Sequence, residues 1–335
     1  MSAKRDTGLD VLKLIATVAV VRLHTGFSDG FLDEILYYLS GIAVPIFFMV
    51  SGALTLNRGD SVTYKYCFKR ALRILRIIVL WNLLFVVFDF LRYKTFVNPF
   101  YYAALSFVQN GFLFHFWYLW ALLFLYCLAP VLKKIFENDK VNKRITVTWL
   151  CIMLFLSLYN VYAELNGRAR IEQLVPQVFR FWVYIGYYWL GGLIYKNRNK
   201  SVRIFEECKG TWIVSMIVYS VACSMFEYLY CVKFIRNHSP ENLFTNPFII
   251  VWTVLVFIVF TSIAYGKKLS GFVFKVIKLS FGVYVMHPFF IVVLQHLGYW
   301  ENANWGFNFF VVLLSSVFIT FIINRISVIN KLIHL

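Results

Sequence analysis

The sequence predicts an all-α, polytopic membrane protein with about ten transmembrane helices, and three observations carry this prediction. Of its 335 residues, 61% are hydrophobic and only 15% are charged, whereas a soluble domain has about 45–50% apolar and about 25% charged residues. The apolar residues gather into runs of about 20, the length that crosses a bilayer. Lys and Arg concentrate in alternate connections between these runs. We therefore expect the solvent of this chain to be lipid.

Ten apolar runs are long enough to be spans. They cover residues 9–27, 34–56, 74–91, 112–132, 145–163, 176–195, 211–232, 247–265, 276–296 and 305–326. The connections between them are short, and neither a Pro/Ser/Gly-rich linker nor an internal repeat divides the chain. We expect one membrane domain over residues 1–335, multi-pass in the cell (plasma or inner) membrane.

The positive charges predict the orientation of the chain. If the N-terminus is inside, the cytoplasmic segments hold 24 of the 33 Lys and Arg residues. Short loops rich in Lys and Arg stay cytoplasmic, so both chain ends are predicted to be cytoplasmic. The net charge of +17 is then a topology signal, and it does not indicate a nucleic-acid-binding surface.

The first span carries four ionisable residues, Asp10, Lys13, Arg22 and His24, and such residues are costly in a membrane and usually functional. Lys13 and His24 are eleven residues apart, so they project from one helix face about 16 Å apart. With the Lys13 cation and the His24 imidazole on the same helix face, this face could bind an elongated anionic ligand. Asp10 is spaced to pair with Lys13. The alternative is that Lys13 snorkels to the surface and His24 only bonds a neighbouring helix.

Three arginines precede the third span at i,i+3 spacing: Arg70, Arg73 and Arg76. We expect them where that helix begins, at the cytoplasmic boundary. Guanidinium groups bind phosphates through a planar fork, so the triplet favours a ligand with several phosphates. The alternative is anchoring of the helix to anionic lipid.

Two further polar residues, Arg22 and His287, can each be interpreted in two ways. Arg22 either pairs with Asp33 or Glu34, at the start of the second span, or binds a substrate. His287 precedes Pro288, and a proline within a span leaves a carbonyl that protein or a cavity must satisfy. His287 therefore either lines a substrate cavity or bonds that carbonyl.

The sequence contains no motif for a resident cofactor. The six cysteines show no CxxC or Cys/His metal spacing, and no P-loop, GxSxG, HExxH or dinucleotide fingerprint is present. We expect neither a metal nor a structural disulfide.

Taken in order, these residues resemble the acyltransferase 3 family, membrane proteins that O-acylate surface polysaccharides and related molecules. The similar motifs are the Asp10-Val11-Leu12-Lys13 segment followed by His24, the FF-x-x-SG pattern within Val44 to Thr55, the R-x-x-R pattern at Arg70, Arg73 and Arg76, a W-x-L pattern ending in Tyr126 and Pro130, and the Tyr284-x-x-His287-Pro288 motif. Lys13 stands where the family has arginine, which keeps the charge but loses the planar fork. The SGNH domain fused to some members is absent from this sequence.

The resemblance implies an acyl-CoA donor on the cytoplasmic side, with acetyl-CoA as the simplest case. The arginine triplet, with Lys13, would bind its phosphates, and Asp10 would orient Lys13. The pantetheine arm would place the thioester near His24. The acceptor would be a hydroxyl of a glycan or lipid-linked sugar outside, contacted by Arg22 and His287.

His24 would then act either as a general base or as a transiently acylated group, because an imidazole accepts a proton near neutral pH. Two other functions use the same features: a transporter or flippase of a lipid-linked sugar, and a membrane sensor or partner-binding subunit. Membrane lipid is a further expected partner, and the sequence leaves open whether a second copy of the chain is another.

Overall fold

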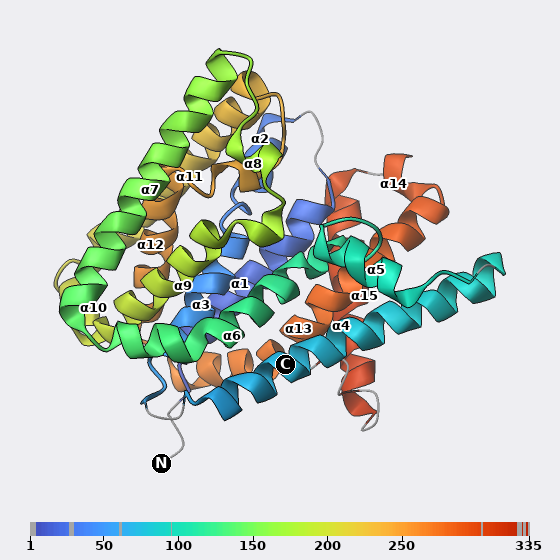
Figure 1. Ribbon diagram of the computed structural model, residues 1–335, viewed down its shortest axis with the longest axis horizontal. Helices are drawn as coiled ribbons and strands as arrows, with labels where there is room; N and C mark the ends of the chain where they lie inside the picture. The colour runs from blue at the N-terminus through green and yellow to red at the C-terminus, as the bar shows by residue number, and fades with distance from the viewer. Residues whose placement is uncertain are drawn as a thin grey trace.

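The computed structural model describes residues 5–26, 30–59, 62–94, 96–302 and 304–326, with Asn330 and Ile333, and within them it contains helices and no strand (Figure 1). The longer helices are α1 (Thr7–His24), α2 (Phe31–Tyr38), α3 (Ala43–Leu56), α4 (Tyr64–Tyr93), α5 (Pro99–Phe107), α6 (Trp117–Phe136), α7 (Asp139–Leu165), α9 (Phe181–Lys196), α10 (Arg198–Glu207), α11 (Lys209–Tyr228), α12 (Pro247–Ser262), α13 (Lys267–His296) and α15 (Trp305–Arg325). The short ones are η2 (Phe114–Phe116), α8 (Ile171–Leu174), η3 (Gln177–Phe179), η4 (Leu229–Phe234), η5 (Pro240–Leu243) and α14 (Tyr299–Asn302).

Seven helical segments of the described chain are long and apolar enough to cross a membrane. They are Phe31–Leu56, Tyr64–Leu91, Phe114–Phe136, Asp139–Leu165, Lys209–Phe234, Lys267–His296 and Trp305–Arg325. The other three predicted spans coincide with α1, α9 and α12, which are shorter or carry more charge. The all-helical, multi-pass fold is confirmed, while the number ten and the orientation stay predictions. Residue 27, Lys4 and Lys331, which entered those predictions, lie outside the described residues.

Two helices begin well before the apolar run that predicted them. Helix α4 begins at Tyr64 rather than at residue 74, and α13 begins at Lys267 rather than at residue 276. The Thr63 side chain caps α4 by accepting a hydrogen bond from the Tyr66 N–H. Both added segments are rich in Lys or Arg, so hydropathy alone did not include them. The arginine triplet consequently lies inside α4 and not where this helix begins.

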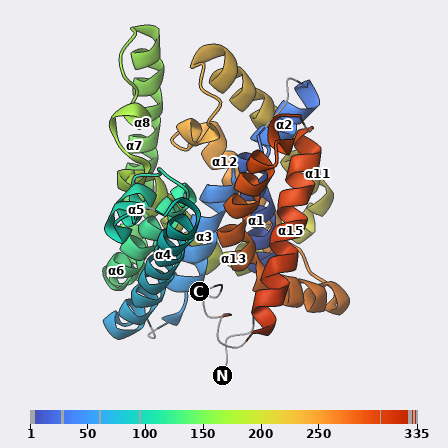
Figure 2. The same cartoon turned by 90° about the vertical axis from the view of Figure 1, so that its right-hand side faces the viewer.

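Helix α1 lies at the centre of the bundle and packs against α3, α12 and α13 (Figure 2). It runs from Asp6, whose side chain accepts hydrogen bonds from the Gly8 and Leu9 N–H groups, to His24. We call the two ends of the bundle the Asp6 end and the His24 end. Every polar residue on α1 is thereby held at a fixed depth in the bundle.

Helices α3 and α9 pack closely because each presents glycine to the backbone of the other. A Cβ atom on Gly52 would lie 1.8 Å from the Tyr188 carbonyl oxygen, and one on Gly191 would lie 2.0 Å from the Met49 carbonyl oxygen. Small residues allow two membrane helices to approach to this distance. Gly52 and Gly191 are therefore the residues that allow α3 and α9 to pack this closely.

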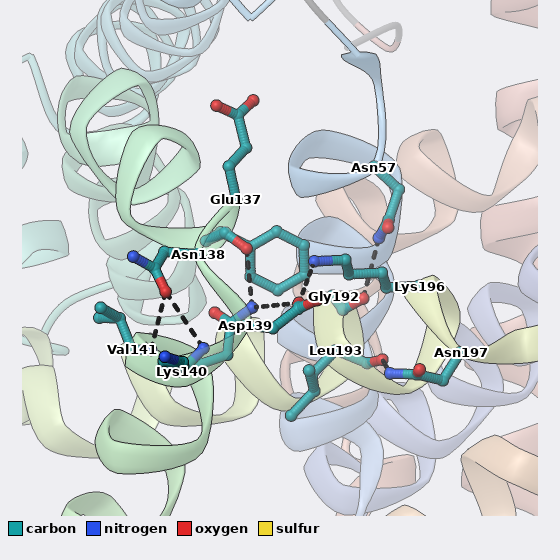
Figure 3. A network of polar contacts seen from close by, with 12 residues as sticks. Asn57, Glu137, Asn138, Asp139, Lys140, Val141, Gly192, Leu193, Lys196 and Asn197 are labelled. Carbon is teal, nitrogen blue, oxygen red and sulfur yellow. Dashed lines mark hydrogen bonds and ion pairs between the residues drawn. The ribbon is translucent and has the colours of Figure 1, made fainter.

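Polar contacts tie α3, α7 and α9 together at the Asp6 end (Figure 3). The Asn57 side chain donates to the Gly192 carbonyl oxygen at 2.9 Å. The Lys196 ammonium lies 2.6 Å from an Asp139 oxygen, and Asn138 caps α7 through two backbone N–H groups. Because these groups belong to three helices, they fix the relative positions of the helix ends.

Replacing Gly191 by alanine tests the glycine contact. The added Cβ would meet a backbone oxygen that cannot rotate away, so we expect a loss of about 1–3 kcal/mol in stability and a lower melting temperature in detergent. Gly271→Ala is the matched control, because no atom lies within 4 Å of its Cβ position and alanine favours a helix. Equal melting temperatures for the two variants would contradict the close packing of α3 on α9.

Candidate active site

His24 is the last residue of α1, where it faces the middle of α13. Its Nδ1 lies 2.7 Å from Nε2 of His287. The two ring planes are parallel within 3° and their centroids are 5.0 Å apart. Since the nitrogens are so much closer than the centroids, the rings meet edge to edge, the direction in which an imidazole makes hydrogen bonds. The structure thus joins two histidines that are 263 positions apart.

The hydrogen bonds of His287 determine which nitrogen of His24 is free. Nδ1 of His287 lies 3.3 Å from the Val283 carbonyl oxygen, and a carbonyl only accepts, so this Nδ1 carries a proton. The Nε2 of a neutral His287 is then an acceptor, and His24 must donate to it from Nδ1. The remaining nitrogen of His24, Nε2, therefore carries a lone pair. Within the described residues no group hydrogen-bonds this Nε2.

A third histidine, His115, completes the cluster, and sequence reasoning did not single it out. It lies on η2, is 2% exposed, and its ring centroid is 5.2 Å from that of His287. Its backbone carbonyl accepts a hydrogen bond from the Tyr284 hydroxyl at 2.5 Å. Neither ring nitrogen has a hydrogen-bond partner among the described residues. The one available signal was its position just before Trp117, in the segment that resembled a family motif.

Two of the three histidines border a cavity of about 200 Å³ at the His24 end. His24 and His115 line it, together with aromatic side chains and a polar group formed by Gln109, Ser239 and Glu241. Most of the wall comes from α1, η2, α6 and η5. A cavity that combines aromatic walls with a few polar groups is typical of small-molecule sites.

Lys13 and Asp10 lie near the Asp6 end in a cluster of charges. The Asp10 carboxylate is 2.5 Å from Nε of Arg5 and 4.0 Å from the Lys13 ammonium. Asp10 is 6% exposed. The predicted pairing of Asp10 with Lys13 therefore exists, although Arg5 is its closer partner.

The arginine triplet divides between two surroundings. Arg70 is half-buried, while Arg73 and Arg76 are exposed. Arg70 lies close enough to Lys13 for the two charges to interact, and its guanidinium lies over the Tyr66 ring at 5.6 Å. Residues three apart on a helix diverge by about 60° per step, so the triplet cannot keep one face. Arg70 alone is brought to the Lys13 cluster.

Arg22 is committed to an ion pair away from the cavity wall. Its guanidinium lies 2.5 Å from an Asp33 carboxylate oxygen and 4.1 Å from the centroid of the Trp305 ring. Arg22 and Asp33 are 5% exposed each. Of the alternatives that the sequence left open, the structure shows the pairing with Asp33.

The described residues contain no group of three or more His, Cys, Asp or Glu side chains arranged to hold a metal ion. Their six cysteines are all free thiols. The candidate site therefore consists of histidines, aromatic side chains and a few polar groups, and these support proton transfer and nucleophilic chemistry.

Together these features describe a multi-pass membrane protein with a pair of hydrogen-bonded histidines, one of which lines a cavity. The family comparison agrees: residues 6–325 match the acyltransferase domain model of the acyltransferase 3 family. The chain belongs to this family, and it is a membrane acyltransferase. No curated protein and no solved structure matches the chain.

Replacing Arg22 by methionine distinguishes an ion pair from a substrate contact. Breaking a buried pair from one side costs about 3–5 kcal/mol, so we expect Arg22→Met to lower the melting temperature strongly. The double variant Arg22→Met/Asp33→Asn should recover much of this loss, because it leaves no full charge from this pair in the apolar interior. A normal melting temperature combined with a raised acceptor KM would instead assign Arg22 to substrate binding.

Proposed function

We propose that the protein is an O-acyltransferase that moves an acyl group, acetyl in the simplest case, from cytoplasmic acyl-CoA to a hydroxyl of an extracytoplasmic glycan or glycan precursor. The observation that carries the proposal is the position of His24, which lines the cavity while its Nδ1 is held by His287, so that Nε2 is the nitrogen left to act as a base. An acyl transfer to oxygen needs a base at the attacking hydroxyl.

The reaction proceeds by addition and elimination at the thioester. His24 Nε2 takes the proton of the acceptor hydroxyl as its oxygen attacks the carbonyl carbon. The carbon–sulfur bond of the tetrahedral intermediate then breaks, and the CoA thiolate takes the proton from His24. An ester and free CoA are formed. Throughout, the Nδ1–H of His24 keeps its bond to His287, so the imidazolium is oriented and stabilised.

His115 is the candidate donor to the oxyanion of that intermediate. Its ring lies against His287 and borders the cavity, and its nitrogens bond no described residue. Donors aimed at the developing negative charge usually contribute the largest catalytic effect. A neutral His115 has one N–H for this purpose, and the Tyr284 hydroxyl holds the backbone of His115 in place.

The Asp6 end has the charge needed to bind the phosphates of acyl-CoA. Three cations, Arg5, Lys13 and Arg70, surround a single carboxylate, Asp10, so the cluster keeps a positive excess. Lys13 and His24 are separated by about 16 Å of α1. This separation supports a donor whose nucleotide stays at the Asp6 end while its thioester reaches His24.

The free lone pair of His24 is also compatible with a two-step acyl transfer through an acylated histidine. In it, Nε2 attacks the thioester, CoA leaves, and the acyl group passes from His24 to the acceptor hydroxyl. Rapid acid quenching of the enzyme with labelled acetyl-CoA and no acceptor distinguishes the routes. Label on a peptide containing His24 identifies the two-step route, and its absence identifies direct transfer.

Substitution of the histidine pair tests the chemistry. We expect His24→Ala to lower the turnover of acetyl-CoA and crude surface glycan by about 10²–10⁴-fold. His287→Ala should lower kcat, with KM for acetyl-CoA unchanged, because it acts through the orientation of His24. The measurement is labelled acyl transfer with purified membranes at matched expression.

The matched control for this pair is His296→Ala, because His296 is an exposed histidine on the same helix as His287. It should retain wild-type activity. No CoA release by the wild-type protein with several acyl-CoAs and crude glycan would contradict the proposed function and favour the transporter alternative.

Substitution of the arginines tests the donor site. Loss of a charged hydrogen bond costs about 1.5–3 kcal/mol, so Arg70→Ala should raise KM for acetyl-CoA by about 10–100-fold. Arg73→Ala, on the next turn of α4 and exposed, should raise it much less. A larger effect at Arg73 than at Arg70 would place the phosphates away from Lys13.

A further inference from the structure

The cavity at the His24 end has a distinctive distribution of charge. No Lys or Arg is among the described side chains that line it. When His24 and His115 are neutral, Glu241 is the one side chain of this lining that carries a full charge. The other polar groups near His24 are uncharged amides and hydroxyls, such as Gln109, Ser239 and Tyr37. A negatively charged ligand would therefore meet a carboxylate in the lining of the cavity and no lining cation.

Three buried arginines of the same end are engaged outside the cavity lining. Arg22 pairs with Asp33. Arg170 pairs with Glu164 at 3.2 Å. The third, Arg180, donates to the backbone carbonyl oxygens of Val175 at 3.0 Å and Glu172 at 2.5 Å, and also to Oε1 of Gln177 at 2.9 Å. None of these three side chains lines the cavity, although Arg180 lies close enough to Glu241 for the two charges to interact.

Glu241 is held in place with spare hydrogen-bonding capacity. The Gln109 amide donates to both carboxylate oxygens, at 3.4 and 3.2 Å, and the Gln177 side chain also hydrogen-bonds it. A carboxylate offers about four lone-pair sites, so it can accept further hydroxyl groups. Burial raises the pKa of Glu241, while Arg180 and the two amides favour its charged form.

The backbone of Gln109 turns the chain at the end of α5. Gln109 is the second residue after this helix, and its φ angle is 60°, the left-handed conformation in which helices commonly end. The Asn110 N–H donates to the Leu105 carbonyl oxygen at 2.8 Å, as this type of helix end requires. The Gln109 side chain is thereby fixed where its amide reaches Glu241.

The dimensions of the cavity match one sugar unit. About 200 Å³ has room for on the order of ten to twenty non-hydrogen atoms, which is the scale of a monosaccharide. Trp117, Phe47 and Tyr118 line the cavity and provide apolar faces for the C–H surface of a pyranose ring, while Glu241 accepts from its hydroxyl groups.

We propose that this cavity binds one uncharged sugar ring of the acceptor, with Glu241 and Gln109 engaging its hydroxyls, and that it rejects sugars carrying a carboxylate. The inference rests on the proposed function for the role of the bound sugar as acceptor. Glu241 is then a specificity-determining residue. By binding some of the ring hydroxyls it orients the sugar, and this orientation decides which other hydroxyl reaches His24.

The test compares the binding of two probes, methyl β-glucopyranoside and methyl β-glucuronide, to the purified full-length protein. Saturation-transfer NMR at mildly alkaline pH gives a dissociation constant for each. We expect the neutral glycoside to bind at least about tenfold more tightly, since an unpaired like charge is strongly disfavoured. Equal or tighter binding of the glucuronide by the wild-type protein would overturn the proposal without any variant.

The Glu241→Gln variant keeps the shape of the side chain and removes its charge. We expect it to weaken binding of the neutral glycoside by about tenfold and to abolish most of the discrimination against the glucuronide. Glu34→Gln is the matched control: Glu34 is at the same end, on α2, and does not line the cavity. It should retain the wild-type ratio. An unchanged ratio in folded Glu241→Gln would overturn the role of Glu241.

Binding and transfer are measured separately, so the two proposals can fail independently. Selective binding of the neutral glycoside without CoA release from acetyl-CoA would retain the sugar site and contradict the acyltransfer reaction proposed for it. CoA release with crude glycan but with no preference between the two glycosides would retain the reaction and contradict the selectivity of the cavity.

Discussion

The hydrogen bond between Nδ1 of His24 and Nε2 of His287 is the interaction on which the candidate site depends. It fixes the ring of His24 at the end of α1 and, because His287 donates to the Val283 carbonyl, it leaves Nε2 of His24 unprotonated. The same bond joins α1 to α13 where both helices border the cavity. Without it, His24 would be an imidazole of undefined tautomer and direction.

The two ends of helix α1 lie in surroundings of opposite charge. At the Asp6 end, a cluster with excess positive charge surrounds Asp10; at the His24 end, a small cavity carries a single carboxylate, Glu241. Our proposals assign ligands of opposite character to these two ends: a polyanionic donor to the Asp6 end and an uncharged, hydroxyl-rich acceptor to the His24 end. Helix α1 can hold them apart because α3, α12 and α13 enclose it, and the glycine contacts fix α3 on α9.

The sequence revealed the features that depend on composition and local spacing. Runs of apolar residues predicted the all-helical membrane fold, and His24 and His287 were singled out as ionisable residues within spans. Their direct contact was not predictable, since pairing of residues 263 apart depends on helix packing. His115 lies inside the predicted span 112–132 and was not singled out, although it is an ionisable residue within a span. Glu241 was missed because it lies in a short helix between two spans, where a lone polar residue carries no periodic signal. The prediction that the arginine triplet lies where a helix begins was wrong, because α4 begins at Tyr64 and extends through a basic segment before the apolar run.

The most direct test of the account is the protonation of His24 in the resting protein. Solid-state NMR of the protein labelled with ¹⁵N-histidine distinguishes protonated from unprotonated ring nitrogens, and a His24→Gln sample identifies the signals of His24 by their loss. The account predicts a neutral His24 with a protonated Nδ1 and an unprotonated Nε2. A proton on Nε2, with Nδ1 bare, would contradict the free base on which the proposed reaction depends.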